Sequence, residues 1–313
     1  MRKPSNLAFG PVVSRRFGSS LGLSTVPLKI CNYSCVYCQL GPTRCRTIER
    51  ACYYSPTQVV EALDSCLGRS KTPPDFVTVI GEGEPTLARN LGAIMKGVRK
   101  AWKGNLALVT NGSLLGLDEV KDVLNYFDVV SPTVSAADPS TFRRLHRPHP
   151  SIEFEAVANG LRELKDHFDG RIWPEVMLVE GYNDSDGSLS GIASLLSEIR
   201  PDKVFLSVPT RPPSMVTVRP AGRQSLESAM AKLPKVVDMT MPEPSTFPSS
   251  QEERVAHLIS VSRFHPLREG QAIKMLLEGG SEEEARTILA ELVAKGRLRT
   301  RTYGGERYYK GLE

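Results

Sequence analysis

Short apolar segments rich in β-branched residues alternate along the chain with helical patterns, and this alternation restricts the possible folds more than any other feature. Six strands are expected, at residues 21–28, 76–80, 106–109, 127–134, 175–179 and 204–208. Helices are expected between them, for example at 56–67, where Ser55 suits the N-cap, and at 153–167. Strands that alternate with helices predict an α/β fold built around a parallel sheet.

A segment rich in Pro and Ser interrupts the alternation and predicts a linker at residues 241–250, which divides a core of residues 1–240 from a domain of residues 251–313. Three helical patterns follow, at 252–261, 267–277 and 282–294. A hairpin comes last, with Gly304 and Gly305 at its turn. Three helices and a two-stranded wing predict a small winged helix-turn-helix-like domain.

The 313 residues are enough to bury a large core, and their net charge of +5 is unevenly distributed. Residues 1–50 hold eight Lys or Arg and one acid, Glu49, so this end favours anions. The N-terminus lacks the apolar core of a signal peptide, and no apolar run is long enough to span a bilayer. We therefore expect a cytoplasmic protein without a membrane contact.

Six cysteines are present, and Cys31, Cys35 and Cys38 form a Cys-x3-Cys-x2-Cys run in a polar loop after the first expected strand. In a reducing compartment such a run indicates metal or redox chemistry, and three protein ligands leave one metal position open. Thiolates suit zinc and iron-sulfur clusters alike. Of the others, Cys66 is expected in a helix core, and a second metal site at Cys45 and Cys52 stays open.

The cysteine spacing resembles that of the radical SAM superfamily. The resemblance implies a 4Fe-4S cluster on the three thiolates, with its fourth iron chelated by S-adenosyl-L-methionine (SAM). In "GEGEPTL", Gly83 and Glu84 match the motif that receives the methionine amino group, although Gly81 and Glu82 depart from the commonest double glycine.

Further cofactor residues are implied after successive strands by the same resemblance. They are Tyr37 at the adenine, Asn111 at the ribose or carboxylate, and Ser135 and Asn183 in similar positions. Each sequence alone is an ordinary turn. Their recurrence at strand ends fits the partial (β/α)6 TIM-like barrel of the superfamily, whose sites lie at the carboxyl ends of the strands.

The implied activity is that of an oxidoreductase-type enzyme. An electron from a flavodoxin or ferredoxin cleaves SAM to a 5'-deoxyadenosyl radical, which abstracts hydrogen from a substrate. Residues 7–220, with "RLHRPHP" and "PTRPP", resemble a largely uncharacterised branch related to the tRNA wyosine-base synthases. Those synthases carry three further cysteines before the triad, and residues 1–30 here contain none, so their specific reaction is not implied.

Basic residues give the clue to the substrate. The candidate substrate-binding residues are Arg15, Arg16, Arg143, Arg144 and Arg147. Such a ring suits RNA phosphates, which favours RNA modification, or a phosphorylated metabolite. A protein side chain as substrate and an iron-sulfur redox-sensing transcription regulator are the alternatives, but the acidic start of the last helix, at Glu282, opposes binding in a DNA groove. His146 and His149 are not assigned as metal ligands, and no residue is assigned as the acid, base or hydrogen donor.

Overall fold

The computed structural model describes residues 7–70, 72–80, 82–240, 251–277 and 281–312. Four parallel strands form the centre of its largest sheet, in the order β2 (Gly18–Leu23), β5 (Phe76–Ile80), β6 (Asn105–Thr110) and β7 (Val129–Pro132). β1 (Ala8–Ser14) pairs antiparallel with β2 at one edge, and β8 (Arg171–Ile172) pairs parallel with β7 at the other.

A second parallel sheet continues the first around the barrel. It contains β9 (Glu175–Met177), β10 (Val204–Ser207) and β11 (Val236–Asp238), with β10 in the middle. A parallel bridge between Thr133 and Glu175 connects β7 to β9. Six parallel strands, β2, β5, β6, β7, β9 and β10, therefore form an open barrel, and each of the six expected strands is present.

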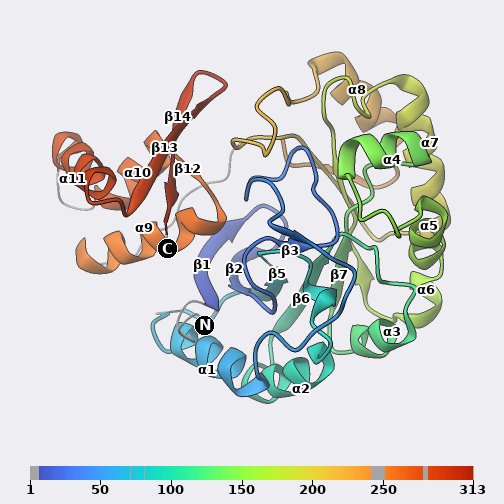
Figure 1. Ribbon diagram of the computed structural model, residues 1–313, viewed down its shortest axis with the longest axis horizontal. Helices are drawn as coiled ribbons and strands as arrows, with labels where there is room; N and C mark the ends of the chain where they lie inside the picture. The colour runs from blue at the N-terminus through green and yellow to red at the C-terminus, as the bar shows by residue number, and fades with distance from the viewer. Residues whose placement is uncertain (1–6, 71, 81, 241–250, 278–280, 313) are drawn as a thin grey trace.

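Helices surround the curved sheet on its outer side (Figure 1). They are α1 (Pro56–Leu67), α2 (Leu91–Ala101), α3 (Asp118–Leu124), α4 (Pro139–His146), α5 (Phe154–Arg162), α6 (Leu164–His167), α7 (Asp186–Ile199) and α8 (Arg223–Lys232). α1 begins as expected, because the Ser55 hydroxyl accepts from Gln58 N and the Gln58 amide oxygen accepts from Ser55 N. The single helix expected at 153–167 is divided into α5 and α6 at Glu163.

The main hydrophobic core lies between the sheet and these helices. Leu21, Leu23, Val77 and Val79 of the strands are fully buried against it. Cys66 of α1 is 4% exposed in the same core, which confirms its predicted packing role. None of the helices within the described ranges has the length and apolar content required to cross a bilayer.

The C-terminal residues form a separate group with its own core beside β1 (Figure 1). The group contains α9 (Gln251–Phe264), β12 (Leu267–Arg268), α10 (Glu269–Leu276), α11 (Glu282–Ala294), β13 (Leu298–Tyr303) and β14 (Glu306–Gly311). β13 and β14 form the expected hairpin, and Gly304 and Gly305 at its turn have φ values of +58° and +79°. The linker predicted at 241–250 lies outside the described residues.

Candidate functional site

The cysteine loop begins at β3 (Ile30–Cys31), which pairs with β4 (Cys45–Arg46), and the loop after β5 packs directly against it. Glu84 N donates to Ile30 O at 3.1 Å, and Lys29 N donates to Glu82 O at 2.7 Å. A Cβ on Gly83 would overlap the carbonyl oxygen of Ile30. Gly83 is therefore required sterically, because only glycine lets these two backbones approach so closely.

Each of the three loop thiols is partly buried and lies beside a polar group. The sulfur of Cys31 accepts from Tyr33 N at 3.4 Å, and the sulfur of Cys38 accepts from the Lys29 ammonium at 3.2 Å. Cys35 Sγ lies 3.5 Å from His146 Nδ1. Burial raises the pKa of Cys31 to about 12 and raises that of Cys35 as well, so ionisation of these thiols requires a nearby positive group such as a metal.

Glu84 is buried and accepts four hydrogen bonds. Its Oε1 accepts from Thr86 N, Thr86 Oγ1 and Thr110 Oγ1 at 3.0, 2.6 and 2.6 Å, and its Oε2 accepts from Asn111 N at 2.8 Å. Burial raises the pKa of Glu84 although these bonds oppose the rise. Because Oε2 has a single partner within the described residues, it keeps the capacity to accept from a further donor.

Asn111 is brought next to the first cysteine. Its Nδ2 donates to Asn32 Oδ1 at 2.6 Å and lies 3.8 Å from Cys31 Sγ, while Asn32 Nδ2 donates to Ser113 Oγ at 2.6 Å. The structure therefore joins Cys31, Glu84 and Asn111, which the sequence predicted as site residues, in one connected group.

Ser135 and Asn183 lie together, and their side chains form hydrogen bonds with backbone groups. Asn183 Nδ2 donates to Ser135 O and Met177 O at 2.8 and 2.9 Å, and its Oδ1 accepts from Val179 N. Ser135 Oγ accepts from Met177 N at 2.9 Å. Both residues hold the loop that follows β9 at the strand ends, which is a positioning role.

Tyr37 contacts a histidine that the sequence analysis left unassigned. The Tyr37 hydroxyl is 3.4 Å from His146 Nδ1, the same nitrogen that faces Cys35. Burial lowers the pKa of His146 to about 3, so its imidazole is neutral at physiological pH. His146 and Lys29 are thus neighbours of the thiols that the sequence analysis missed, and no periodic signal marks either of them.

A cavity of about 390 Å³ extends from the cysteine loop into the barrel. Cys35, Tyr37 and Cys38 line one part of it, and Ile80, Val109, Thr133, Met177 and Val208 line it from the strand ends. Arg15 and Arg16, two of the predicted substrate-binding residues, also line the cavity.

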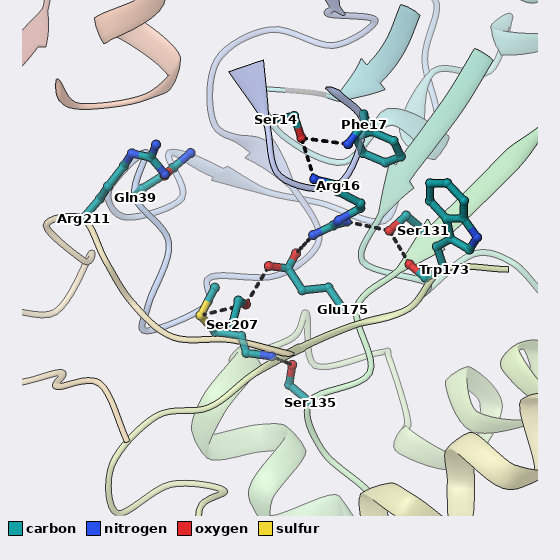
Figure 2. A network of polar contacts seen from close by, with 11 residues as sticks. Ser14, Arg16, Phe17, Gln39, Ser131, Ser135, Trp173, Glu175, Ser207 and Arg211 are labelled. Atoms are coloured by element: carbon teal, nitrogen blue, oxygen red, sulfur yellow. Dashed lines mark hydrogen bonds and ion pairs between the residues drawn. The ribbon is translucent and has the colours of Figure 1, made fainter. Parts of the chain in front are cut away.

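Arg16 is held inside the barrel by an ion pair with Glu175 (Figure 2). Its Nη2 lies 2.7 Å from Glu175 Oε2, and its Nη1 donates to Ser131 Oγ at 2.5 Å. Ser207 Oγ donates to Glu175 Oε1 at 2.7 Å. Burial would raise the pKa of Glu175, but Arg16 and Ser207 together outweigh burial and lower the pKa, so Glu175 is a carboxylate.

The other predicted arginines lie elsewhere. Arg143, Arg144 and Arg147 are exposed on and after α4, and they are absent from the cavity lining within the described chain. Arg144 Nη2 donates to Gly181 O at 2.8 Å, and its guanidinium lies 5.3 Å from the Tyr182 ring centroid. The backbone of this segment instead supports the cysteine loop, because Leu145 O accepts from Val36 N at 3.0 Å.

Comparison with known proteins identifies the class of this site. The model of the radical SAM superfamily matches residues 25–188, more than half of the chain. The chain therefore belongs to the radical SAM superfamily. Its cofactors are a 4Fe-4S cluster and SAM, and enzymes of this superfamily need an external reductant.

Relatives extend the similarity over nearly the whole length. A UPF0026 protein of Methanocaldococcus jannaschii is 32% identical over 97% of this chain and 95% of its own. A UPF0026 protein of Helicobacter pylori is 36% identical over 66% of this chain and 68% of its own. A radical SAM methyltransferase from Sphaerobacter thermophilus has a similar fold, with a TM-score of 0.53 and 16% identity over 71% of this chain and 66% of that one.

Proposed function

We propose that this radical SAM enzyme holds its cluster on Cys31, Cys35 and Cys38 and binds SAM at the adjoining strand ends. One observation carries the proposal: Cys31, Glu84 and Asn111 form a connected group. The residues fit a cluster, since N–H donors face the sulfurs of Cys31 and Cys38.

When bound, the cluster and SAM would supply the radical chemistry of hydrogen abstraction, with a flavodoxin or ferredoxin-type protein as the electron donor. Glu84 Oε2 would accept from the amino group of SAM, and the Asn111 amide would help to hold the cofactor. Tyr37 would contact the adenine. Ser135 and Asn183 act indirectly, by fixing the loops at the strand ends.

We further infer that residues 251–313 form a winged-helix-type domain after a linker at 241–250. The order of three helices and a hairpin, with β12 pairing on β14, supports this inference. The hairpin is turned toward the barrel: Arg301 Nη1 donates to Pro213 O at 3.0 Å, and Lys310 Nζ donates to Leu40 O at 3.0 Å.

RNA modification is the second candidate function. The exposed Arg143 of α4 and Arg147 just after it favour RNA modification, because exposed guanidiniums suit the phosphates of a nucleic acid.

Anaerobic reconstitution tests the proposed function. The wild-type enzyme should bind four irons and four sulfides, change its electron paramagnetic resonance spectrum on addition of SAM, and form 5'-deoxyadenosine when reduced. Nucleoside analysis of tRNA and rRNA from a deletion strain tests the RNA candidate, and unchanged profiles would remove it. A protein that bound zinc, or a cluster whose spectrum ignored SAM, would overturn the proposal.

A further inference from the structure

The cavity at the cysteine loop is closed in part by the C-terminal group of elements. The lining residues from this group are His257, Val261, His265, Leu267, Gln271 and Met275. The volume of about 390 Å³ lies at the scale of small-molecule sites. The room available suits a small substrate better than a folded macromolecule.

Contacts on several sides hold the C-terminal group against the barrel. The rings of Phe9 and Phe264 stack with their centroids 3.9 Å apart. Gln39, next to Cys38, donates from Nε2 to Phe264 O at 3.0 Å, and the Tyr308 hydroxyl donates to Thr210 O at 2.9 Å. The wall that α9 and α10 contribute to the cavity is therefore a built part of the site.

Arg16 and Glu175 both line the cavity, and the pair keeps hydrogen-bonding capacity. Within the described chain each oxygen of Glu175 has one hydrogen-bonding partner, Ser207 for Oε1 and Arg16 for Oε2, and a carboxylate can accept about four bonds. Arg16 contacts Ser131 through Nη1 and Glu175 through Nη2, and each of these nitrogens carries a second hydrogen. Because this net-neutral ion pair offers both hydrogen-bond donors and acceptors, it suits an uncharged substrate group that can also donate and accept, such as a hydroxyl or carboxamide.

His257 of α9 presents a second polar group to the cavity. It lines the cavity, and its imidazole has no hydrogen-bond partner within the described part of the chain. Burial lowers the pKa of His257 to about 4, so the ring is neutral and offers one donor and one acceptor.

We propose that the substrate is a small molecule bound in this cavity, with a hydroxyl or carboxamide group held by Arg16 and Glu175 and a second polar group held by His257. The inference rests on the proposed radical SAM function, because it concerns the substrate of the same site. It assigns the C-terminal group a role in substrate recognition inside the cavity.

The test measures 5'-deoxyadenosine formed by reconstituted full-length enzyme with SAM and a reductant. Two probes are added separately: the small-molecule ultrafiltrate, and total RNA, of a strain that lacks the gene and so accumulates the substrate. The ultrafiltrate should stimulate the wild type. Glu175→Gln should lower the ratio of stimulated to unstimulated product at least about tenfold, because a hydrogen bond to a charged group is lost.

Two further variants keep the result interpretable. Glu198→Gln is the matched control, since Glu198 pairs with Arg162 at 2.6 Å on the surface, outside the cavity lining, and it should behave as the wild type. His257→Phe leaves the Arg16–Glu175 pair untouched and should also reduce stimulation, which covers a failure of Glu175→Gln to fold. Stimulation by RNA alone, no stimulation by the ultrafiltrate, or full stimulation of a folded Glu175→Gln or His257→Phe variant overturns this inference. Absence of 5'-deoxyadenosine from the wild type would instead refute the proposed function.

Discussion

Substitution of Gly83 by Ala should disturb the cysteine loop although it adds a single methyl group. The new Cβ would overlap Ile30 O and lie 2.6 Å from Ile30 C and 3.2 Å from Ile30 N. All three are backbone atoms, so no side-chain rotation relieves the contact. The two segments must move apart, which breaks the hydrogen bonds from Glu84 N to Ile30 O and from Lys29 N to Glu82 O.

The expected loss in the free energy of unfolding follows from these broken hydrogen bonds and from the added methyl group. Two backbone hydrogen bonds contribute about 1 kcal/mol each, and inserting a methyl group into a packed site costs about 1–3 kcal/mol. The free energy of unfolding should therefore fall by roughly 3–5 kcal/mol. Because Cys31 follows Ile30 directly, iron bound after reconstitution should fall as well.

Urea denaturation of the apoprotein and iron analysis of the reconstituted protein measure the two effects. Gly187→Ala is the matched control: Gly187 lies in the first turn of α7, and a Cβ there meets nothing within 4 Å. The control should be neutral or stabilised by up to about 1 kcal/mol, because Ala favours a helix. Equal stability and equal iron content in the two variants would refute the steric argument at Gly83.

Three other perturbations have defined outcomes. Substitution of Cys31, Cys35 or Cys38 by Ala should abolish the iron-sulfur absorbance and SAM cleavage, whereas Cys52→Ala, at an exposed thiol, should retain both. A cluster retained after substitution of any of the three would contradict the assignment. Phe264→Ala should lower the free energy of unfolding by about 3–5 kcal/mol through the lost ring stacking on Phe9, measured by urea denaturation against exposed Val216→Ala. The folded pKa of His257, about 4, lies below its ordinary 6.5, so the free energy of unfolding should fall as pH drops from 6.5 toward 4, where the unfolded chain binds a proton that the buried ring does not. His257→Phe should remove up to about 3 kcal/mol of this pH dependence, measured by denaturation between pH 7.5 and 4. An unchanged pH dependence would count against burial of the ring.

Hydrophobic periodicity predicted the elements that bury a full face. All six central strands and the helix at α1 are found where apolar residues alternate or recur, because burial against the core fixes both the pattern and the structure. β1 was missed because Gly10 and Pro11 are unfavourable inside a strand; they are tolerated at a sheet edge, where the β1 pairing is irregular between Phe9 and Val12. β8 and β11 are too short to show a period.

Site residues were predictable where a family motif marks them and unpredictable where distant segments meet. The motif gave Cys31, Glu84 and Asn111, and the structure brings them together. Glu175 was missed as a partner of Arg16 because nothing local links two residues so far apart in the chain. A charged residue that begins an otherwise apolar strand, after Pro174, was the available signal.

Arginine counts predicted an anion-binding ring, and that ring stays a prediction. A guanidinium or ammonium donates to a carbonyl oxygen as readily as to a phosphate oxygen, and sequence shows the donor without its acceptor. Here Arg144, Arg301 and Lys310 each donate to a backbone carbonyl, and Arg16 pairs with a carboxylate. The charge of an arginine or lysine therefore says little about the substrate until its acceptor is known, and of these four residues Arg16 is the one that lines the cavity.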